Sequence, residues 1–103
     1  MAEPSASISA IVVVFHTGPA LWRCLDSLAA AQIGRVIVID NGSDAETLAG
    51  LRARASADAR IVLESGHGNI GFAAGCNRGA ARAQGDWLLF LNPDAALAPG
   101  APE

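Results

Sequence analysis

The chain has little charge, few cysteines and no long apolar segment. Charged residues make up 17% of its 103 residues, the net charge is -3, and the Arg residues form no cluster. A chain without a basic patch releases few counterions from a phosphate backbone, so we expect no nucleic acid partner. No stretch is long enough to span a membrane, and no basic segment precedes an apolar run at the N-terminus. We therefore expect a cytoplasmic protein with no transmembrane segment.

Cysteine is scarce, since the sequence holds only Cys24 and Cys76. Both lie in predicted helices and they lack CxxC spacing, which argues against a zinc site or a disulfide framework. We expect two free buried thiols.

Apolar residues, by contrast, account for 51% of the chain, which is enough for one domain with a core. The two ends are rich in Pro, Ala and Ser, a composition that favours disorder at chain termini. We predict a disordered tail at 1–7, a domain over 8–100, and a C-terminal tail at 101–103.

Apolar runs alternate with segments of helical periodicity. The runs predict strands of a parallel sheet at residues 8–15, 35–40, 60–64 and 86–91. Helices are predicted between them at 20–32, 45–57 and 72–84. Three strand–helix repeats that end on a strand predict an α/β fold, a three-layer Rossmann-like parallel sheet with helices on both faces.

Polar or aromatic residues end or directly follow every predicted strand. The pairs are Phe15 and His16, Asp40 and Asn41, Glu64 and His67, and Asn92 and Asp94. In an open α/β sheet, ligands bind outside the carboxyl ends of the strands, so we expect the functional site at this edge. Asp40 stands where a carboxylate accepts hydrogen bonds from a ribose or a base, although a turn aspartate is the alternative. His16 is either a ligand-binding residue or an exposed loop histidine.

The sequence GHGNIG at 66–71 matches the GxGxxG pattern of dinucleotide-binding turns. This match favours a small NAD-type Rossmann domain. Its place after the third strand argues against that function, because the fingerprint usually opens its fold. A structural alternative is that Gly71, Gly75 and Gly79 form a smooth helix face for close packing.

Asn92, Pro93 and Asp94 are the most specific motif. Pro93 has no N–H and ends the strand, so that two short side chains with oxygen atoms can face one point. Mg²⁺ and Mn²⁺ prefer such ligands and keep open positions for substrate phosphates. An acidic protein that binds a diphosphate also needs a cation between the two anions. The alternative is an Asn-Pro-Asp turn without a ligand.

Four motifs together resemble a known family. The segments VVVFH, VIVIDNGS, GNIGFAAGCNRG and LLFLNPDA are similar to the nucleotide-sugar-binding half of family 2 glycosyltransferases, most of all the rhamnosyltransferase-like branch. The resemblance implies a GT-A type fold that binds a nucleoside diphosphate sugar with a divalent metal, Mn or Mg. The sugar would pass to a saccharide or lipid-linked acceptor.

The resemblance also assigns residues to parts of the donor. Phe15 would stack near the base, with His16 beside it, and Asp40 would bond the base or ribose. The diphosphate side would be shaped by Asn69, Gly71 and Asn77. Asn92 and Asp94 fall on the DxD element, with Asp94 as the metal ligand and Asn92 near the ribose or a metal-bound water.

Two departures from the family pattern limit what the resemblance implies. Asn92 and Ala95 stand where the family has acidic residues, so we expect weaker metal binding. The family's acceptor region and acidic catalytic base follow this point, whereas the chain stops at Glu103. We therefore expect a truncated fold that binds donor with little transfer alone, and its catalytic residue is unknown. A noncatalytic nucleotide-binding module is the alternative, and an exposed sheet edge would favour a homodimer.

Overall fold

The computed structural model describes residues 8–31 and 33–95. The tails predicted at 1–7 and 101–103, and residues 96–100 of the predicted domain, lie outside the described residues.

The described residues alternate strictly between strands and helices. Their order is β1 (Ile8–Phe15), α1 (Ala20–Ala30), β2 (Arg35–Gly42), α2 (Ala45–Ala57), β3 (Ile61–Glu64), α3 (Phe72–Ala81) and β4 (Trp87–Phe90). Each element lies where the apolar pattern predicts it, and α2 has the predicted bounds. The α2 helix starts there because the Asp44 carboxylate accepts a hydrogen bond from the Thr47 N–H at 2.7 Å.

The α3 helix ends earlier than predicted, because Ser9 binds the backbone that follows it. The Ser9 hydroxyl accepts from the Gln84 N–H at 2.9 Å and donates to the Gln84 carbonyl oxygen. A backbone group held in this way no longer extends the helical ladder. The contact fixes the segment that leads from α3 into β4.

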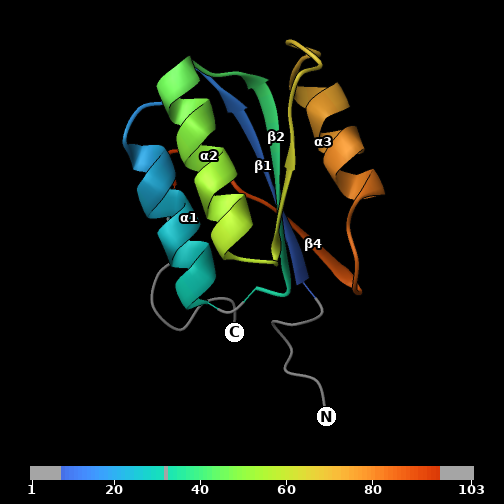
Figure 1. Cartoon of the computed structure of the whole chain (residues 1–103). Coiled ribbons are helices and arrows are strands. Elements are labelled where there is room, and N and C mark those ends of the chain that lie inside the picture. Colours follow the sequence, from blue (N-terminus) through green and yellow to red (C-terminus); the bar gives the residue numbers. More distant parts are fainter. Residues whose placement is uncertain (1–7, 32, 96–103) are drawn as a thin grey trace.

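The sheet is parallel throughout, with the strand order β3-β2-β1-β4 (Figure 1). The chain adds β2 and β3 on one side of β1 and then returns across the sheet to place β4 on the other side. The strand order therefore reverses between β1 and β4, which is the switch point where doubly wound sheets bind ligands.

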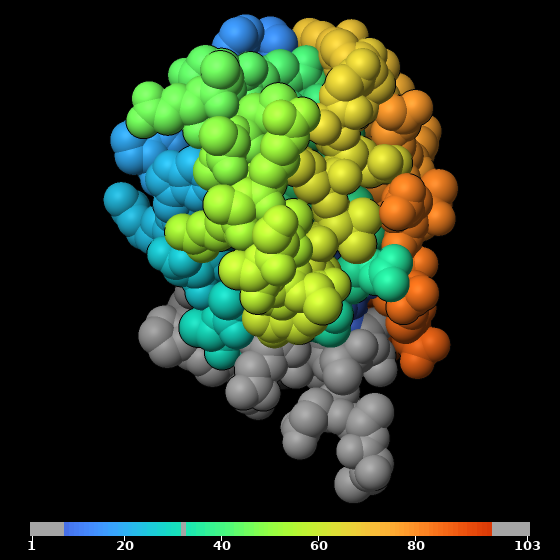
Figure 2. All heavy atoms as spheres, viewed as in Figure 1, coloured from blue at the N-terminus to red at the C-terminus, as the bar shows by residue number. Residues whose placement is uncertain are grey.

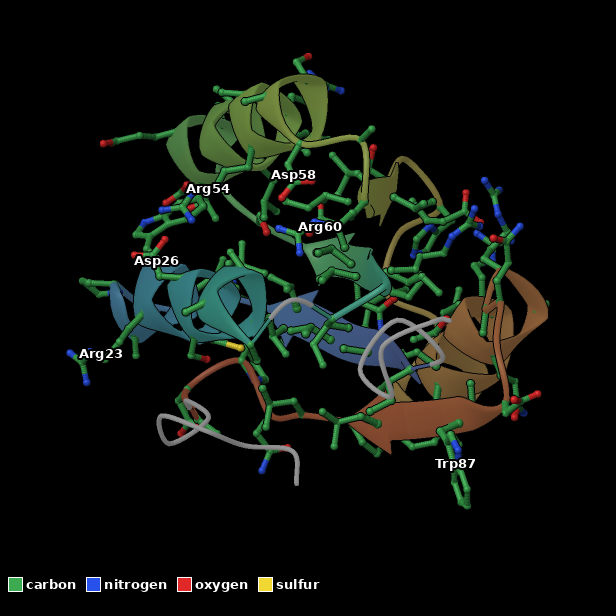
Figure 3. All side chains as sticks on the ribbon, turned by 90° about the horizontal axis from the view of Figure 1, so that it is seen from below. Arg23, Asp26, Arg54, Asp58, Arg60 and Trp87 are labelled. Atoms are coloured by element: carbon green, nitrogen blue, oxygen red, sulfur yellow. The ribbon has the colours of Figure 1, made fainter. Side chains whose placement is uncertain are left out.

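Helices cover both faces of this sheet, as predicted (Figures 1 and 3). Ala10, Val12 and Val14 of β1 belong to the core cluster packed against α1 and α2. Ile11 and Val13 alternate with them and belong to the second cluster, under α3. In the space-filling view, α2 and the segment from β3 to α3 form most of the surface on one side (Figure 2).

The two helices on the first face are also joined at the surface. Arg54 of α2 forms an ion pair with Asp26 of α1 at 2.5 Å (Figure 3), and its guanidinium lies 5.3 Å from the centre of the Trp22 ring. Exposed ion pairs of this kind contribute little to stability. The packing of α1 and α2 therefore depends mainly on their buried apolar side chains.

Glycine lets α3 lie very close to β1. An added Cβ on Gly79 would be 2.5 Å from Ile11 Cγ2, and one on Gly75 would be 3.0 Å from Val13 Cγ1. The expected close packing of this helix face is thus confirmed at these two positions. Gly71 serves differently, since it begins the helix with φ 87° and has no heavy atom within 4 Å of an added Cβ.

The last strand, β4, is largely exposed, although its apolar sequence is typical of a strand buried in a parallel sheet. Trp87 is 67% exposed and Phe90 is 49% exposed, and Trp87 points away from the sheet (Figure 3). The physical reason is that β4 lies at the edge of the sheet and, among the described elements, packs mainly against β1, whereas α2 packs against β3 at the other edge. Apolar sequence therefore predicts the strand correctly and its burial incorrectly.

Candidate functional site

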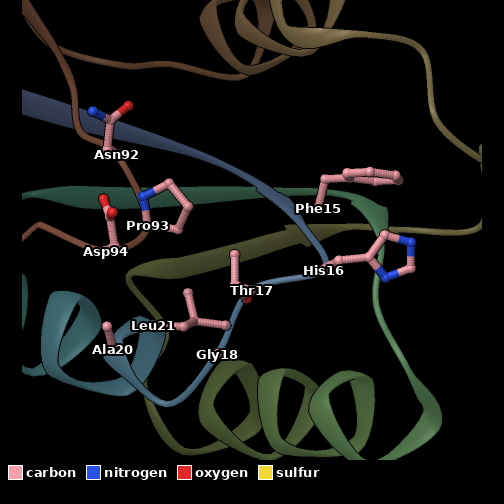
Figure 4. Close-up of a pocket in the computed structure, with 9 residues that line it drawn as sticks. All are labelled: Phe15, His16, Thr17, Gly18, Ala20, Leu21, Asn92, Pro93 and Asp94. Atoms are coloured by element: carbon pink, nitrogen blue, oxygen red, sulfur yellow. The ribbon is translucent and has the colours of Figure 1, made fainter.

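A pocket of about 460 Å³ opens at the switch point between β1 and β4 (Figure 4). Three segments line it, namely the end of β1, the start of α1 and the turn that follows β4. Their lining residues are Phe15, His16, Thr17, Gly18, Ala20, Leu21, Asn92, Pro93 and Asp94. The pocket thus joins two motifs that lie far apart in the sequence.

A β-bulge at the end of β1 presents the aromatic wall. Val14 pairs with Asp40, but Phe15 pairs with Gly42, so one residue of β2 is skipped. The Phe15 ring lies against Gly42, where an added Cβ would be 2.9 Å from Phe15 Cδ1. His16 has φ 50° and donates its N–H to the Gly42 carbonyl oxygen at 2.7 Å. Bulges of this kind redirect side chains next to binding sites.

The two rings of this wall contact each other. The centres of Phe15 and His16 are 4.2 Å apart in an edge-on arrangement. Phe15 is exposed, lies against Gly42 and meets the edge of His16. An exposed aromatic ring held in this way can stack on a flat ligand group.

The opposite wall is the turn after β4. The last ladder hydrogen bond runs from the Leu91 N–H to the Ile11 carbonyl oxygen at 3.1 Å, and the Ala95 N–H then donates to the Asn92 carbonyl oxygen at 3.0 Å. The Cys24 thiol of α1 lies 3.6 Å from that same Asn92 oxygen. The core helix α1 therefore supports the turn that carries Asp94.

Burial and the negative charge of Asp94 also affect the pKa of the Cys24 thiol. Burial, and secondly the negative charge of Asp94, raise the pKa of Cys24 to about 11. The thiol therefore stays protonated and neutral at physiological pH. Because the Cys24 thiol is neutral, it is a poor cation ligand and leaves Asp94 as the anionic group of this turn.

Thr17 contributes a polar group that the sequence pattern did not reveal. Its hydroxyl oxygen is buried and has no hydrogen-bond partner within the described part of the chain, although Thr17 lines the pocket. A buried hydroxyl without a partner is costly. The only sequence signal was its place directly after His16.

The oxygen atoms of the pocket fit a divalent cation that is shared with a ligand. Asp94 supplies a carboxylate and Asn92 an amide oxygen to the pocket lining. Among the residues that the structure describes, no cluster of three or more His, Cys, Asp or Glu could hold a metal alone. Mg²⁺ is commonly held by one or two carboxylates together with substrate phosphates. The fit is therefore to a cation that binds with a phosphate ligand.

Asp40 lies outside this pocket. It is 6% exposed, and its Oδ1 accepts hydrogen bonds from the Gly42 N–H at 3.2 Å and the Ser43 hydroxyl at 2.7 Å. These hydrogen bonds match the alternative interpretation, in which Asp40 is a turn aspartate. They also hold Gly42, against which the Phe15 ring lies.

The residues predicted for the diphosphate side lie on and beside the 66–71 loop. The Asn69 side chain accepts a hydrogen bond from the Gly71 N–H at 2.9 Å, and Asn77 is exposed on α3. None of Asn69, Gly71 and Asn77 lines the switch-point pocket. The structure thus brings Phe15, His16, Asn92 and Asp94 together and leaves the other predicted residues outside.

A second hollow of about 240 Å³ connects α3 with the site. It is lined by Ile11, Val13, Phe72, Cys76, Phe90, Leu91, Asn92 and Ala95. Asn92 is common to both hollows. The first turn of α3 is therefore a neighbour of the switch-point pocket.

The expectation for the cysteines is met in part. Both cysteines are free, but only Cys24 is buried, while Cys76 is half-buried because it lines the second hollow. Within residues 8–31 and 33–95, no helix has the length and apolar character needed to cross a membrane.

The fold and the pocket define a doubly wound α/β domain with its ligand site at the switch point. Residues 9–103 match the sequence model of glycosyl transferase family 2. The chain belongs to this family, which confirms the resemblance seen in its motifs. No curated protein sequence matches the chain.

Solved glycosyltransferase structures share the fold. Residues 1–349 of S. aureus TarS have a TM-score of 0.75 at 22% identity, over 87% of this chain and 28% of that one. The mannosyltransferase PcManGT from Pyrobaculum calidifontis, in complex with GDP-Man and Mn²⁺, has a TM-score of 0.76 at 21% identity, over 87% and 28%. TarS 1-349 in complex with UDP-GlcNAc gives 0.73 at 22% identity, over 85% and 26%. The chain thus spans only 28% or less of these proteins.

Proposed function

We propose that the chain binds a nucleoside diphosphate sugar at the switch-point pocket, as the donor-binding part of a glycosyltransferase. The observation that carries this proposal is the meeting of an exposed aromatic ring, Phe15, and a carboxylate, Asp94, in one pocket. Membership of glycosyl transferase family 2 supports it. Two structures of the same fold are complexes with GDP-Man and Mn²⁺ and with UDP-GlcNAc.

The two walls suit the two ends of such a donor. Phe15 would stack on the base, with His16 at its edge, because both rings lie on one side of the pocket (Figure 4). Asp94 would hold a divalent cation, Mn or Mg, beside the diphosphate, with Asn92 near the ribose or a metal-bound water. When bound, the cation neutralises the charge that grows on the leaving diphosphate.

We propose donor-binding roles also for the remaining predicted residues, which lie outside the pocket lining. The turn occupies only Oδ1 of Asp40 among the hydrogen bonds of the described residues, so we propose Oδ2 for the base or ribose. Asn69, Gly71 and Asn77 would face the diphosphate from the 66–71 loop and α3. The acceptor would be a saccharide or a lipid-linked saccharide.

The pocket does not supply a base for the acceptor. Asp94 is the sole carboxylate among the described residues that line it, and we assign it to the cation. Deprotonation of an acceptor hydroxyl needs a second group within hydrogen-bond reach. We therefore propose that the 103-residue chain binds donor but transfers little or no sugar alone.

The test is calorimetric titration with UDP, dTDP, GDP and NAD, each with Mn²⁺ and with chelator. We expect one nucleoside diphosphate to bind only with Mn²⁺, and Asp94→Ala to weaken it by about tenfold or more, since a carboxylate ligand is lost. Asp86→Ala is the matched control, because Asp86 is an exposed carboxylate outside the pocket lining.

Two results would contradict the proposal. Binding of NAD without a cation would favour a dinucleotide site at the GxGxxG turn, which needs no metal. Binding of none of the four ligands would remove the donor-site function altogether.

A further inference from the structure

Asn41 is the residue that β1 skips at its bulge, and it is almost completely buried. Its exposed fraction is 3%. Successive side chains of a strand point to opposite faces, and Asn41 follows Ile37 and Ile39, which belong to the cluster under α3. Its amide is therefore a polar group buried on the α3 side of the sheet.

Both ends of this amide bind the 66–71 loop. Asn41 Nδ2 donates to the Gly71 carbonyl oxygen at 3.0 Å, and Asn41 Oδ1 lies 3.1 Å from His67 Nε2. Since the Oδ1 atom only accepts, His67 Nε2 is the donor of the second bond. Among the described residues, these are the hydrogen bonds that join the loop to the sheet.

The glycine backbone of the loop gives it little rigidity of its own. Gly66, Gly68 and Gly71 have φ values of 85°, 73° and 87°, a region that glycine reaches easily and at a high cost in chain entropy. Its one internal side-chain bond is that from the Gly71 N–H to Asn69. Bonds to a buried side chain of the sheet therefore decide where the loop lies.

The same bonds determine where α3 begins. The Gly71 carbonyl oxygen also accepts the N–H of Gly75 at 3.0 Å, which is the first bond of the helix. Phe72, the next residue, lines the hollow that shares Asn92 with the switch-point pocket. A shift at Gly71 thus moves a wall next to the site.

We propose that Asn41 is a positioning residue that holds the 66–71 loop and the first turn of α3 at the carboxyl edge, and so sets the affinity for the diphosphate of the donor. This inference rests on the proposed function, in which Asn69 and Gly71 face the diphosphate. Asn41 itself need not contact the donor.

Its neighbour Gly42 has a separate role and offers a contrast. The Phe15 ring lies against Gly42, so Gly42→Ala would displace the ring at the base end of the pocket. Adjacent residues of β2 would then control opposite ends of the same ligand.

The experiment measures loop exchange and ligand affinity in the full 103-residue chain. Asn41→Asp keeps the acceptor for His67 but places an oxygen against the Gly71 carbonyl, Asn41→Ala removes both bonds, and His67→Ala removes only one. Amide hydrogen exchange over 66–72 is recorded without ligand. Affinity is measured for the tightest binder among UDP, dTDP and GDP and for its monophosphate, with Mn²⁺.

We expect exchange over 66–72 to become about tenfold faster in Asn41→Ala and Asn41→Asp, with β1 unchanged, because local opening is no longer opposed by the amide. Affinity for the diphosphate should fall about five- to tenfold and that for the monophosphate much less, as expected for about one hydrogen bond. His67→Ala should have a smaller effect, and Gly42→Ala should weaken both ligands equally.

Unchanged hydrogen exchange over 66–72 in both Asn41 variants would show that Asn41 does not hold the 66–71 loop, whether or not a nucleotide binds. Equal losses for diphosphate and monophosphate would overturn the link to the diphosphate. If the native chain binds no nucleotide, the proposed function fails, and so does the claim that Asn41 sets the affinity for the diphosphate. In that case the exchange result would still decide whether Asn41 holds the 66–71 loop.

Discussion

Cys24 shows how one residue links the core to the site. Its side chain is buried on α1, and the thiol lies against the turn that carries Asn92 and Asp94. Burial and then Asp94 raise the pKa of Cys24 from its ordinary value of 9.0 to about 11. The pKa of Cys76 is also raised by burial. The folded state therefore favours the protonated thiols.

This preference predicts how stability changes in alkaline solution. Below pH 9 the Cys24 thiol is protonated in the folded and unfolded chains, so its contribution is fully present. Between pH 9 and 11 only the unfolded chain loses the proton, and the free energy of unfolding should fall by about 1.4 kcal/mol per pH unit. The sequence contains no lysine and no tyrosine, so Cys76 is the only other side chain that titrates in this range, and its raised pKa adds a change of the same sign.

Urea unfolding at pH 8 and at pH 10.5 measures the effect, with Cys24→Ala as the comparison. The variant should be less stable at pH 8, because it leaves a cavity, but should lose less stability as the pH rises. If the free energy of unfolding fell equally in both proteins between pH 8 and pH 10.5, the raised pKa of Cys24 would be contradicted.

At the scale of elements, the packing of α3 on β1 is the contact that most restricts substitution. Alanine in place of a helical glycine usually stabilises a helix by about 1 kcal/mol. In Gly79→Ala, however, the new methyl group would be 2.5 Å from Ile11 Cγ2, a branched and buried side chain. Overpacking costs about 1 to 3 kcal/mol, so we expect a net loss of stability.

The urea midpoint of Gly79→Ala checks this expectation against Gly18→Ala. Gly18 has no heavy atom within 4 Å of an added Cβ and lies outside the positive φ region, so its variant should be neutral or slightly more stable. A higher midpoint for Gly79→Ala would show that α3 moves away from β1 without cost.

At the scale of the whole molecule, β4 leaves one edge of the described sheet open. Trp87, Leu88 and Phe90 are exposed there, and β4 pairs with β1 alone among the described strands. Open strand edges with apolar side chains pair with other chains. We predict self-association of the 103-residue chain, in line with the proposed homodimer.

Sedimentation velocity over a range of concentrations measures this association. Phe90→Glu should shift the chain toward monomer, because a charge on an open edge opposes pairing. Ala49→Glu adds the same charge on an exposed position of α2 and should change little. A native chain that stays monomeric at all concentrations would rule out this use of the edge.

The sequence by itself determined the elements, the doubly wound sheet and the meeting of Phe15, His16, Asn92 and Asp94. Local periodicity specifies helices and strands, and parallel strands place their carboxyl ends at one edge whatever the details of packing. The glycines at 75 and 79 were likewise readable as a close-packing face.

Only the tertiary structure decided how each polar group is used. Asp40 binds its own turn, the buried Thr17 hydroxyl has no partner among the described residues, and Asn41 joins the 66–71 loop to the sheet. The exposure of the β4 side chains also depends on the tertiary structure. Hydrogen-bond partners and burial depend on which residues become neighbours in space, and such neighbours leave no periodic signal in the chain.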